Sequence, residues 1–258
     1  MEMSIIQDFY TQITNHYDSL SSTEQIVIDF VMKYGDIEHL KLKDIEDELF
    51  VSSTTIIRAS KKLGYQSFTQ LKYALIQTKN SELSADPPPG VSGYKEIIER
   101  VTHDFSKTIQ LLSEQKVTAF AEEVRQARRI FCIGSGSSVG VISDFNRRLK
   151  LLDLWSNDYY EFYAIERIPD IATSEDVIVV FSLGGKSQAI NQILLKAKTS
   201  GTRIISITSM SVNPLSKISD VNLFTYLSPS PRKKIRSRLM LSVAADVVFE
   251  HLLLSLRH

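Results

Sequence analysis

The sequence has a single cysteine, Cys132, among its 258 residues. One thiol excludes an internal disulfide and any cysteine-based zinc cluster, and it is typical of a chain kept in a reducing cytoplasm. The five histidines are scattered without the spacing of metal ligands, so we expect neither a metal site nor a cofactor. The first ten residues lack the basic segment and small-residue cleavage site of a secretory leader. The most apolar run, residues 239–256, is interrupted by Asp246, Glu250 and His251, so we expect no membrane span.

The sequence also lacks a net charge, since 30 basic residues balance 30 acidic ones. Binding to nucleic acid must therefore be local rather than a property of the whole surface. The charges are segregated along the chain: residues 36–48 hold six acidic residues, whereas residues 49–81 hold five basic residues and no acidic one. The segment 49–81 is therefore the place to look for contacts with a polyanion.

The length of the chain and one unusual segment predict two domains. A chain of 258 residues is longer than the roughly 150 residues typical of one domain. Residues 80–93 read NSELSADPPPGVSG, and three consecutive prolines among small residues cannot continue a helix. We therefore expect a first domain over residues 1–79, a linker over 80–93 and a second domain over 94–258.

The first domain is predicted to be all-helical. Apolar residues recur at helical spacing in short stretches that are separated by turn residues such as Gly35 and Gly64. The expected helices cover residues 5–17, 23–34, 43–49, 53–63 and 68–77. Only three residues separate the third helix from the fourth, which is typical of a helix-turn-helix.

The fourth expected helix carries side chains suited to reading DNA. Its apolar residues share one side, which leaves Thr54, Arg58 and Lys61 on the other. A recognition helix needs short hydrogen-bonding side chains near its N-terminus and longer cations further along. The candidate DNA-binding residues are Ser53, Thr54, Thr55, Arg58, Lys61, Lys62, Ser67 and Lys72. On pattern alone, the same residues also fit the solvated polar face of an ordinary helical domain.

The segment VSSTTIIRASKKLGYQSFTQLK resembles the helix-turn-helix domain of the RpiR family of bacterial transcriptional regulators. The matching residues are Val51, Ser52, Thr55, Ile56, Arg58, Leu63, Gly64, Tyr65, Phe68, Leu71 and Lys72. This resemblance implies that the fourth helix binds operator DNA.

The second domain is predicted to be α/β, with a doubly wound parallel sheet. A helical stretch from about residue 94 to residue 128 comes first, and short apolar strands then alternate with amphipathic helices. The expected strands cover residues 130–133, 177–181, 204–207 and 221–225. A strand such as VIVVF has no polar face, which favours a parallel sheet covered by helices on both sides.

Two glycine- and serine-rich loops follow strands of this sheet, GSGSS at residues 134–138 and SLGGKS at residues 182–187. Such loops let backbone amides approach an anion, and the positive end of the following helix favours a phosphate. Neither loop has the glycine spacing of a Rossmann fingerprint or a P-loop. The alternative on local grounds is a pair of tight strand-to-helix turns.

Residues 128–253 resemble the sugar isomerase (SIS) domain that RpiR-type regulators carry. Ser182, Gly185 and Ser187 match the end of that domain's motif S-x-S-G-x-[ST], and ITSMSVNPLSKISD resembles a second segment of it. The resemblance implies that these loops grip the phosphate of a sugar. The candidate effector-binding residues are Gly136, Ser137, Ser138, Ser182, Gly184, Gly185, Lys186 and Ser187. Gly184 stands where the motif has its middle serine, so we expect weaker phosphate binding unless Lys186 compensates.

The sequence therefore predicts a cytoplasmic, non-enzymatic regulator of sugar-metabolism genes. Its expected partners are double-stranded operator DNA, a phosphorylated sugar and further copies of the chain in a homodimer or homotetramer. One alternative is a sugar-phosphate isomerase, for which Glu161, Glu166 and His103 are free candidates as general base, although none lies in a catalytic motif. Another alternative is a phosphosugar-binding protein whose helical domain contacts protein rather than DNA.

Overall fold

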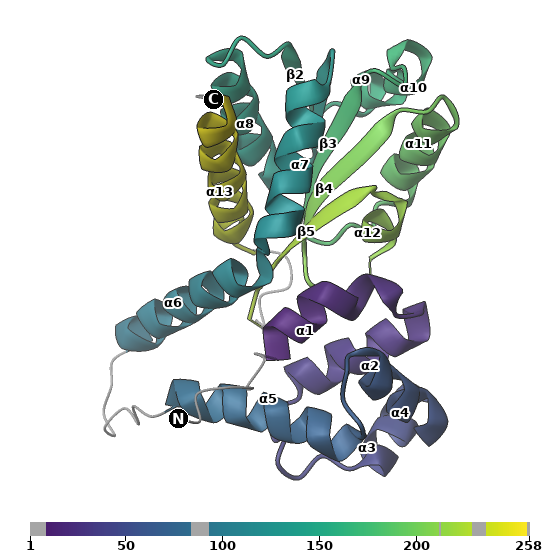
Figure 1. Ribbon diagram of the computed structural model, residues 1–258, viewed down its shortest axis with the longest axis vertical. Coiled ribbons are helices and arrows are strands. Elements are labelled where there is room, and N and C mark those ends of the chain that lie inside the picture. The colour runs from purple at the N-terminus through teal and green to yellow at the C-terminus, as the bar shows by residue number, and fades with distance from the viewer. Residues whose placement is uncertain (1–8, 84–92, 212, 229–235, 257–258) are drawn as a thin grey trace. The chain divides into compact units, whose positions relative to one another are not determined.

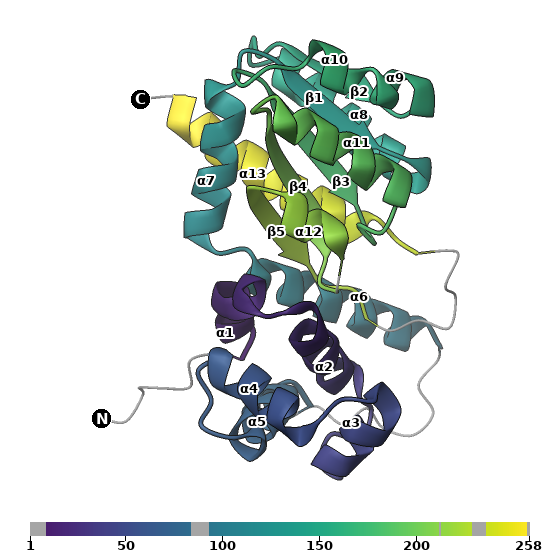
Figure 2. The same ribbon diagram turned by 90° about the vertical axis from the view of Figure 1, so that its right-hand side faces the viewer.

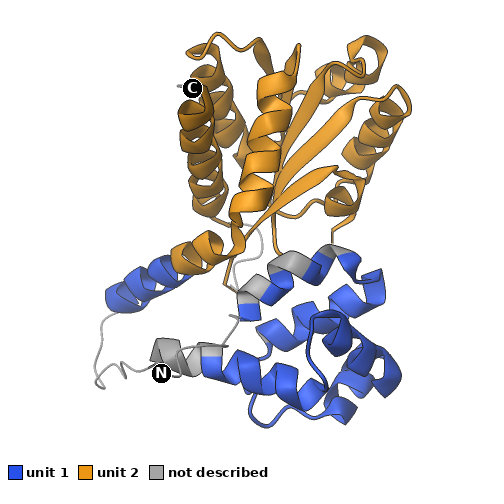
Figure 3. Ribbon diagram, in the orientation of Figure 1, with its two compact units in different colours: residues 1–103 blue, residues 104–258 orange. Residues whose placement is uncertain are grey.

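The computed structural model describes residues 9–83, 93–211, 213–228 and 236–256 (Figures 1 and 2). The chain forms two compact units, residues 1–103 and 104–258 (Figure 3). The division falls inside helix α6 (Gly93–Leu111), whereas helix α5 (Phe68–Leu83) runs past residue 80. The middle of the expected linker, residues 84–92, lies outside the described residues, so the linker over 80–93 stays a prediction.

In its described residues the first unit is helical, as the sequence predicts. Its helices are α1 (Phe9–His16), a 3-10 turn (Tyr17–Ser19), α2 (Ser22–Lys33), α3 (Leu42–Leu49), α4 (Ser53–Lys62) and α5. Ser21 caps α2: the Ser21 side chain accepts from the Glu24 amide, and the Glu24 carboxylate accepts from the Ser21 amide. Ser52 caps α4 in the same way by accepting from the Thr55 amide. The two caps fix where these helices begin.

The second unit contains a five-stranded sheet in the order β2-β1-β3-β4-β5, with every neighbouring pair parallel. The strands are β1 (Ile130–Gly134), β2 (Ser156–Tyr159), β3 (Val177–Ser182), β4 (Arg203–Ser209) and β5 (Val221–Thr225). Four of these were expected. The fifth, β2, has the polar sequence SNDY and lies at the edge, where it pairs only with β1.

Helices cover both faces of this sheet, which confirms the doubly wound α/β prediction (Figures 1 and 2). Ile130 and Cys132 of β1 pack on one face, under α7 (Glu114–Gln126), α8 (Val139–Lys150) and α13 (Leu239–Leu256). Phe131 and Ile133 pack on the other face, under α9 (Phe162–Glu166), α10 (Ile168–Ile171), α11 (Gln188–Thr199) and α12 (Pro214–Ile218). Successive side chains of a strand point to opposite faces, so both layers are held by the same strands.

The helical stretch expected over residues 94–128 is two helices, α6 and α7. The helical stretch is interrupted before Ser113, because the Ser113 side chain accepts from the Lys116 amide and so caps the start of α7. The last part of α6 is tied to the chain after β5: Asp104 accepts from the Ser228 amide at 3.0 Å, and Thr108 accepts from the Tyr226 amide at 3.0 Å.

Among the described helices, α13 alone is long and apolar enough by composition to cross a membrane. Its buried residues pack on the sheet: they are Met240, Leu241, Ala244, Ala245, Val248, Phe249 and Leu252. Seven of its 18 residues are buried, so one face of α13 belongs to the core of the second unit.

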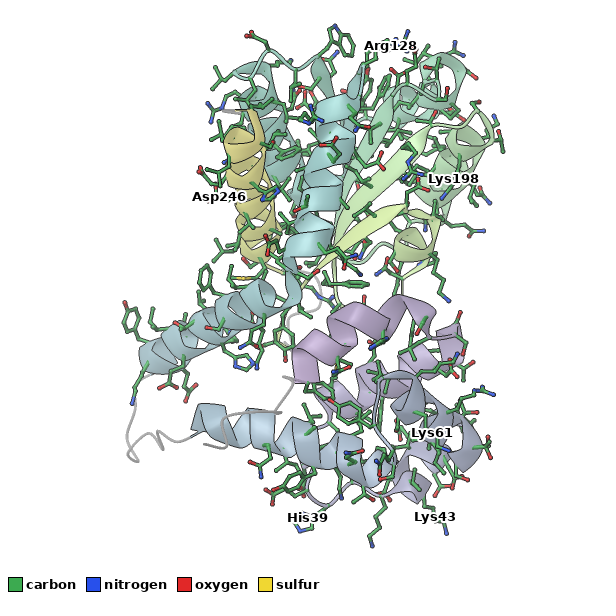
Figure 4. The ribbon with its side chains drawn as sticks, viewed as in Figure 1. His39, Lys43, Lys61, Arg128, Lys198 and Asp246 are labelled. Atoms are coloured by element: carbon green, nitrogen blue, oxygen red, sulfur yellow. The ribbon has the colours of Figure 1, made fainter. Side chains whose placement is uncertain are left out.

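An ion-pair cluster joins the starting ends of β1 and β3. Arg128 and Arg129 immediately precede β1, and each donates to the buried carboxylate of Asp176, with shortest contacts of 3.0 and 2.8 Å. Burial alone would raise the pKa of Asp176, but hydrogen bonds from Arg129, Arg128 and Thr173 outweigh it and hold that pKa well below its usual range. Arg128 is labelled in Figure 4 at this end of the sheet. The cluster fixes the two central strands at the end opposite to the loops considered next.

Candidate functional site

Helices α3 and α4 of the first unit form a helix-turn-helix. Phe50 ends α3 in the left-handed conformation, with φ 53°, and turns the chain toward Ser52. Ile56, Ala59 and Leu63 of α4 are fully buried, as their spacing predicts. The opposite face, with Thr54, Arg58 and Lys61, is exposed. Helix α4 therefore presents a polar face that is available for binding.

The candidate DNA-binding residues on this face differ in how far they are already engaged. The side chain of Lys61 is exposed and makes no hydrogen bond or ion pair within the described residues (Figure 4). At the start of α4, Glu46 of α3 accepts from the Ser53 amide at 2.6 Å. A carboxylate therefore occupies part of the helix N-terminus, so the positive end of α4 is partly satisfied inside the protein.

Arg58 and Lys62 both bind a buried carboxylate that the sequence reasoning missed. Glu24 of α2 accepts from Arg58 Nε at 2.6 Å and from Lys62 Nζ at 2.8 Å, and its side chain is fully buried. Burial would raise the pKa of Glu24, but the hydrogen bonds from Lys62, the Ser21 amide and Arg58 outweigh it and lower that pKa to about 2. Glu24 is therefore charged at any physiological pH.

The last two DNA-binding candidates stabilise the local fold. Ser67 precedes α5 and accepts from the Gln70 amide at 3.2 Å. Lys72 Nζ donates to the carbonyl oxygens of Glu38 and Leu40 at 3.1 and 3.3 Å, which holds the segment before α3. Two of its three N–H donors are thus used inside the unit.

The second candidate site lies where the sheet changes winding direction. The chain leaves β1 toward α8 on one face and leaves β3 toward α11 on the other, although β1 and β3 are neighbours. In open α/β sheets, a crevice forms at the carboxyl ends of two such strands, and ligands bind there. A small hollow, partly open to solvent, lies at this point and is lined by both expected loops.

The residues of the first loop that line the hollow come earlier in the chain than the sequence predicts. Gly134 and Ser135 line the hollow, whereas Gly136, Ser137 and Ser138 do not. Residues 136–138 form a 3-10 turn in which Ser137 is exposed and Ser138 is buried. Ser135 follows directly after the last residue of β1, and this position at the end of the strand could have indicated from the sequence that Ser135 lines the hollow. Within the described residues, the amides of Gly136 and Ser137 donate to no other group.

The second loop supplies Ser182, Gly185 and Ser187 to the hollow, whereas Gly184 and the exposed Lys186 do not line it. Ser187 caps α11 by accepting from the Ile190 amide. The hydrogen bonds of the described chain leave the amides of Gly184, Lys186 and Ser187 without an acceptor. Three unpaired amides at the positive end of a helix form a site suited to an anion.

Two asparagines that sequence reasoning missed fix the shape of this second loop. Asn191 Nδ2 donates to the Gly185 carbonyl oxygen at 3.1 Å. Gly185 has φ +57°, and a Cβ added there would collide with Asn213 Oδ1, which itself accepts from the Ser216 amide. Only glycine fits this conformation and this close approach.

Neither the loops nor the hollow offers an obvious group for proton transfer or metal binding. The lining residues are Ile133, Gly134, Ser135, Val180, Phe181, Ser182, Gly185, Ser187, Ile190, Asn191 and Leu215, none of them titratable near neutral pH. No cluster of metal-ligating side chains occurs in the part of the chain that the structure describes. Burial raises the pKa of the Cys132 thiol far above its usual range, so Cys132 is an unreactive core residue.

Comparison with known proteins assigns both units. Residues 7–82 match the family model described as the helix-turn-helix domain of the rpiR family, and residues 123–249 match that of the SIS domain. The chain belongs to the rpiR family. This rpiR-family regulator is 23% identical over 236 residues to the HTH-type transcriptional regulator RpiR of Escherichia coli K12, covering 86% of this chain and 76% of that protein. An uncharacterized HTH-type regulator of Clostridium perfringens is 26% identical over 229 residues, covering 84% and 81%.

Solved structures share the fold of the regulator. The Vibrio vulnificus NanR protein complexed with ManNAc-6P aligns with TM-score 0.61 and 19% identity, covering 96% of this chain and 92% of that one. The sugar isomerase domain of an RpiR transcription factor from Sphaerobacter thermophilus aligns with TM-score 0.56 and 17% identity, covering 61% and 89%. A putative sugar-phosphate isomerase of Listeria monocytogenes aligns with TM-score 0.52 and 16% identity, covering 66% and 94%. At these identities the likeness concerns the fold alone.

Proposed function

We propose that this rpiR-family transcriptional regulator binds operator DNA through α4 and that a phosphorylated sugar, bound between the β1 and β3 loops, controls that binding. The observation that carries the proposal is the hollow at the sheet's switch point, which both glycine- and serine-rich loops line. The NanR structure, which holds ManNAc-6P on a similar fold, supports the same class of ligand.

A phosphate group matches the donors at this edge. Lys186 and Ser187 immediately precede α11, where the helix dipole is positive, and their amides, like that of Gly184, have no acceptor within the described residues. The hydroxyls of Ser135, Ser182 and Ser187 add donors from both loops. The side chains of Asn191 and Asn213 hold the Gly185 turn, so less entropy is lost when the ligand binds.

The regulator is expected to act in the cytoplasm on genes of sugar metabolism, as a homodimer or homotetramer. A two-fold axis would place two α4 helices about 34–36 Å apart, which is one turn of DNA. Because Arg58, Lys62 and Lys72 are partly engaged inside the domain, one copy offers few free cations. Pairing two copies supplies the missing affinity by avidity.

The direct test is a calorimetric and thermal-shift screen of sugar phosphates, including ManNAc-6P, against the matching unphosphorylated sugars and inorganic phosphate. We expect at least one sugar phosphate to raise the melting temperature in proportion to its occupancy, while its unphosphorylated sugar has no effect. Ser187→Ala should lower the affinity for that sugar phosphate. Fluorescence anisotropy with operator DNA, with and without the ligand, then measures control. No response to any phosphorylated sugar in either assay would overturn the proposal.

An isomerase function is less well supported, because isomerisation needs a general base beside the bound sugar. Glu161 and Glu166 are exposed residues beside and within α9, and His103 lies in α6; none of the three lines the hollow. Incubation with the same sugar phosphates should therefore give no product. Turnover above background would reverse this ranking.

A further inference from the structure

Glu24 connects the first residues of α2 to the DNA-reading helix. Its Oε2 accepts from the Ser21 amide at 2.7 Å and from Lys62 Nζ at 2.8 Å, while its Oε1 accepts from Arg58 Nε at 2.6 Å. The carboxylate is fully buried, whereas the Arg58 and Lys62 side chains are 58% and 39% exposed. One carboxylate therefore anchors the inner ends of two cations whose remaining surface faces solvent.

The contact with Glu24 restricts how Arg58 can meet a base. Its Nε is occupied, and its two terminal nitrogens make no hydrogen bond within the described chain. A guanidinium held by Nε can still offer both terminal nitrogens, end-on, to the O6 and N7 acceptors of a guanine in the major groove. Because Arg58 lies on the exposed face of α4 with Thr54, this geometry suits base reading.

The same contact has the opposite effect on Lys62. Its ammonium donates to Glu24 and also to the Ser19 carbonyl oxygen at 3.3 Å, so its charge is largely compensated inside the domain. Lys61, next to it on the exposed face, has no such partner in the described residues. Of these two neighbouring lysines, only Lys61 is free to neutralise a DNA phosphate.

We propose that Glu24 is a positioning residue for DNA recognition, which aims Arg58 end-on at a guanine and withholds Lys62 from the phosphate backbone. The proposal rests on the proposed DNA reading by α4. In this arrangement Glu24 lowers the non-specific affinity for DNA and raises the preference for one sequence. Contacts to the DNA backbone carry no sequence information, whereas bidentate arginine contacts to a base do.

The test compares the wild type with Glu24→Gln and Lys61→Gln on an operator that the wild-type protein selects from random-sequence duplexes. Glutamine keeps the size of Glu24, and its one oxygen still serves the Ser21 amide in the capping box. It removes the charge and replaces the acceptor for Arg58 Nε with an NH2 donor. We expect Glu24→Gln to bind non-specific DNA more tightly, with a salt slope steeper by about 0.9 per phosphate newly contacted. Its preference for the operator should fall about 5- to 150-fold, the loss expected for one bidentate base contact. The matched control, Lys61→Gln, should make the slope shallower by about 0.9 and keep the preference.

Arg58→Lys keeps the charge but removes the planar fork, so the proposal stays testable even if Glu24→Gln folds poorly. This variant should lose discrimination at one G·C pair while its salt slope stays near that of the wild type. A purely structural Glu24 would lower the melting temperature and leave slope and preference unchanged, and that result would overturn the inference alone. If the wild type selects no operator at all, the proposed DNA reading fails first, and this inference fails with it.

Discussion

Replacing Gly184 with serine should strengthen binding of the phosphorylated ligand. Gly184 stands where the related SIS motif has a serine, and its neighbours in the second loop, Ser182 and Ser187, line the hollow. A Cβ added at Gly184 would meet nothing within 4 Å, and its φ is not positive. A serine is therefore accepted at this position without strain, and it places one more hydroxyl donor on the loop.

The size of the gain follows from the charge on the acceptor. A hydrogen bond between neutral groups contributes about 0.5–1.5 kcal/mol net, and one to a charged group about 1.5–3 kcal/mol. For a phosphate, Gly184→Ser should thus lower Kd about tenfold or more.

The assay is isothermal titration calorimetry with the tightest sugar phosphate from the screen, and Gly185→Ala is its matched control. At Gly185 the conformation is left-handed and the added methyl group would collide with Asn213 Oδ1, so this neighbouring substitution must displace the loop. The displacement costs about 1–3 kcal/mol and should weaken binding about 5- to 150-fold. An unchanged or weaker Kd for a folded Gly184→Ser protein would refute the placement of the phosphate on this loop.

Three further predictions concern single side chains. Asp176→Asn should lower the free energy of unfolding in urea by about 2–3 kcal/mol at pH 7, because the pKa of Asp176 is lowered in the folded state and its carboxylate is therefore stabilising above its unfolded pKa of about 4. The stability difference between the wild type and the variant should shrink as the pH falls below 4. A difference that does not change with pH would refute the ion-pair account. Cys132, fully buried, should react with a thiol reagent only in denaturant; rapid native labelling would contradict its core position. Lys186→Ala should lower the affinity for the sugar phosphate less than Ser187→Ala does, because Lys186 does not line the hollow and Ser187 does. Equal losses of affinity would show that the Lys186 ammonium replaces the hydroxyl of the missing serine.

The core elements were predictable because their signal is local. Strands β1 and β3 are runs of buried, mainly apolar residues, and a short apolar run between turn residues is typical of a strand that is covered on both faces. Strands β4 and β5 mix apolar residues with buried polar ones such as Ser206 and Asn222. Strand β2 has no such signal: its residues SNDY are polar, and only Ser156 among them is buried. Its pairing with β1 is decided by tertiary structure. The break between α6 and α7 did have a local signal, the cap at Ser113, which a long amphipathic pattern concealed.

The sequence predicts the exposed face of α4 and the two loops that line the hollow, but it does not predict the individual contacts there. Periodicity separated the buried and exposed faces of α4, yet it carries no information about Glu24, which lies 34 residues from Arg58 in the sequence. The sequence likewise marks the glycine- and serine-rich loops, but Ser135 rather than Ser137 lines the hollow, because a 3-10 turn carries the later residues away. Spacing along the chain predicts which residues share a helix face, and long-range contacts must come from the fold.

The two ends of strands β1 and β3 show why a shifted pKa would have been a misleading guide to the proposed ligand site. The strongly lowered pKa of Asp176 marks the starting ends, where a fully buried carboxylate joins the two strands. The hollow at the other ends has no titratable lining residue. A site that moves protons needs shifted pKa values, whereas a site that senses a phosphate needs fixed donors, which glycine turns, serine hydroxyls and a helix N-terminus supply without any titration. The donors at this edge fit the proposed sensing of a phosphate, and the ion pairs at the opposite ends of β1 and β3 join the two strands.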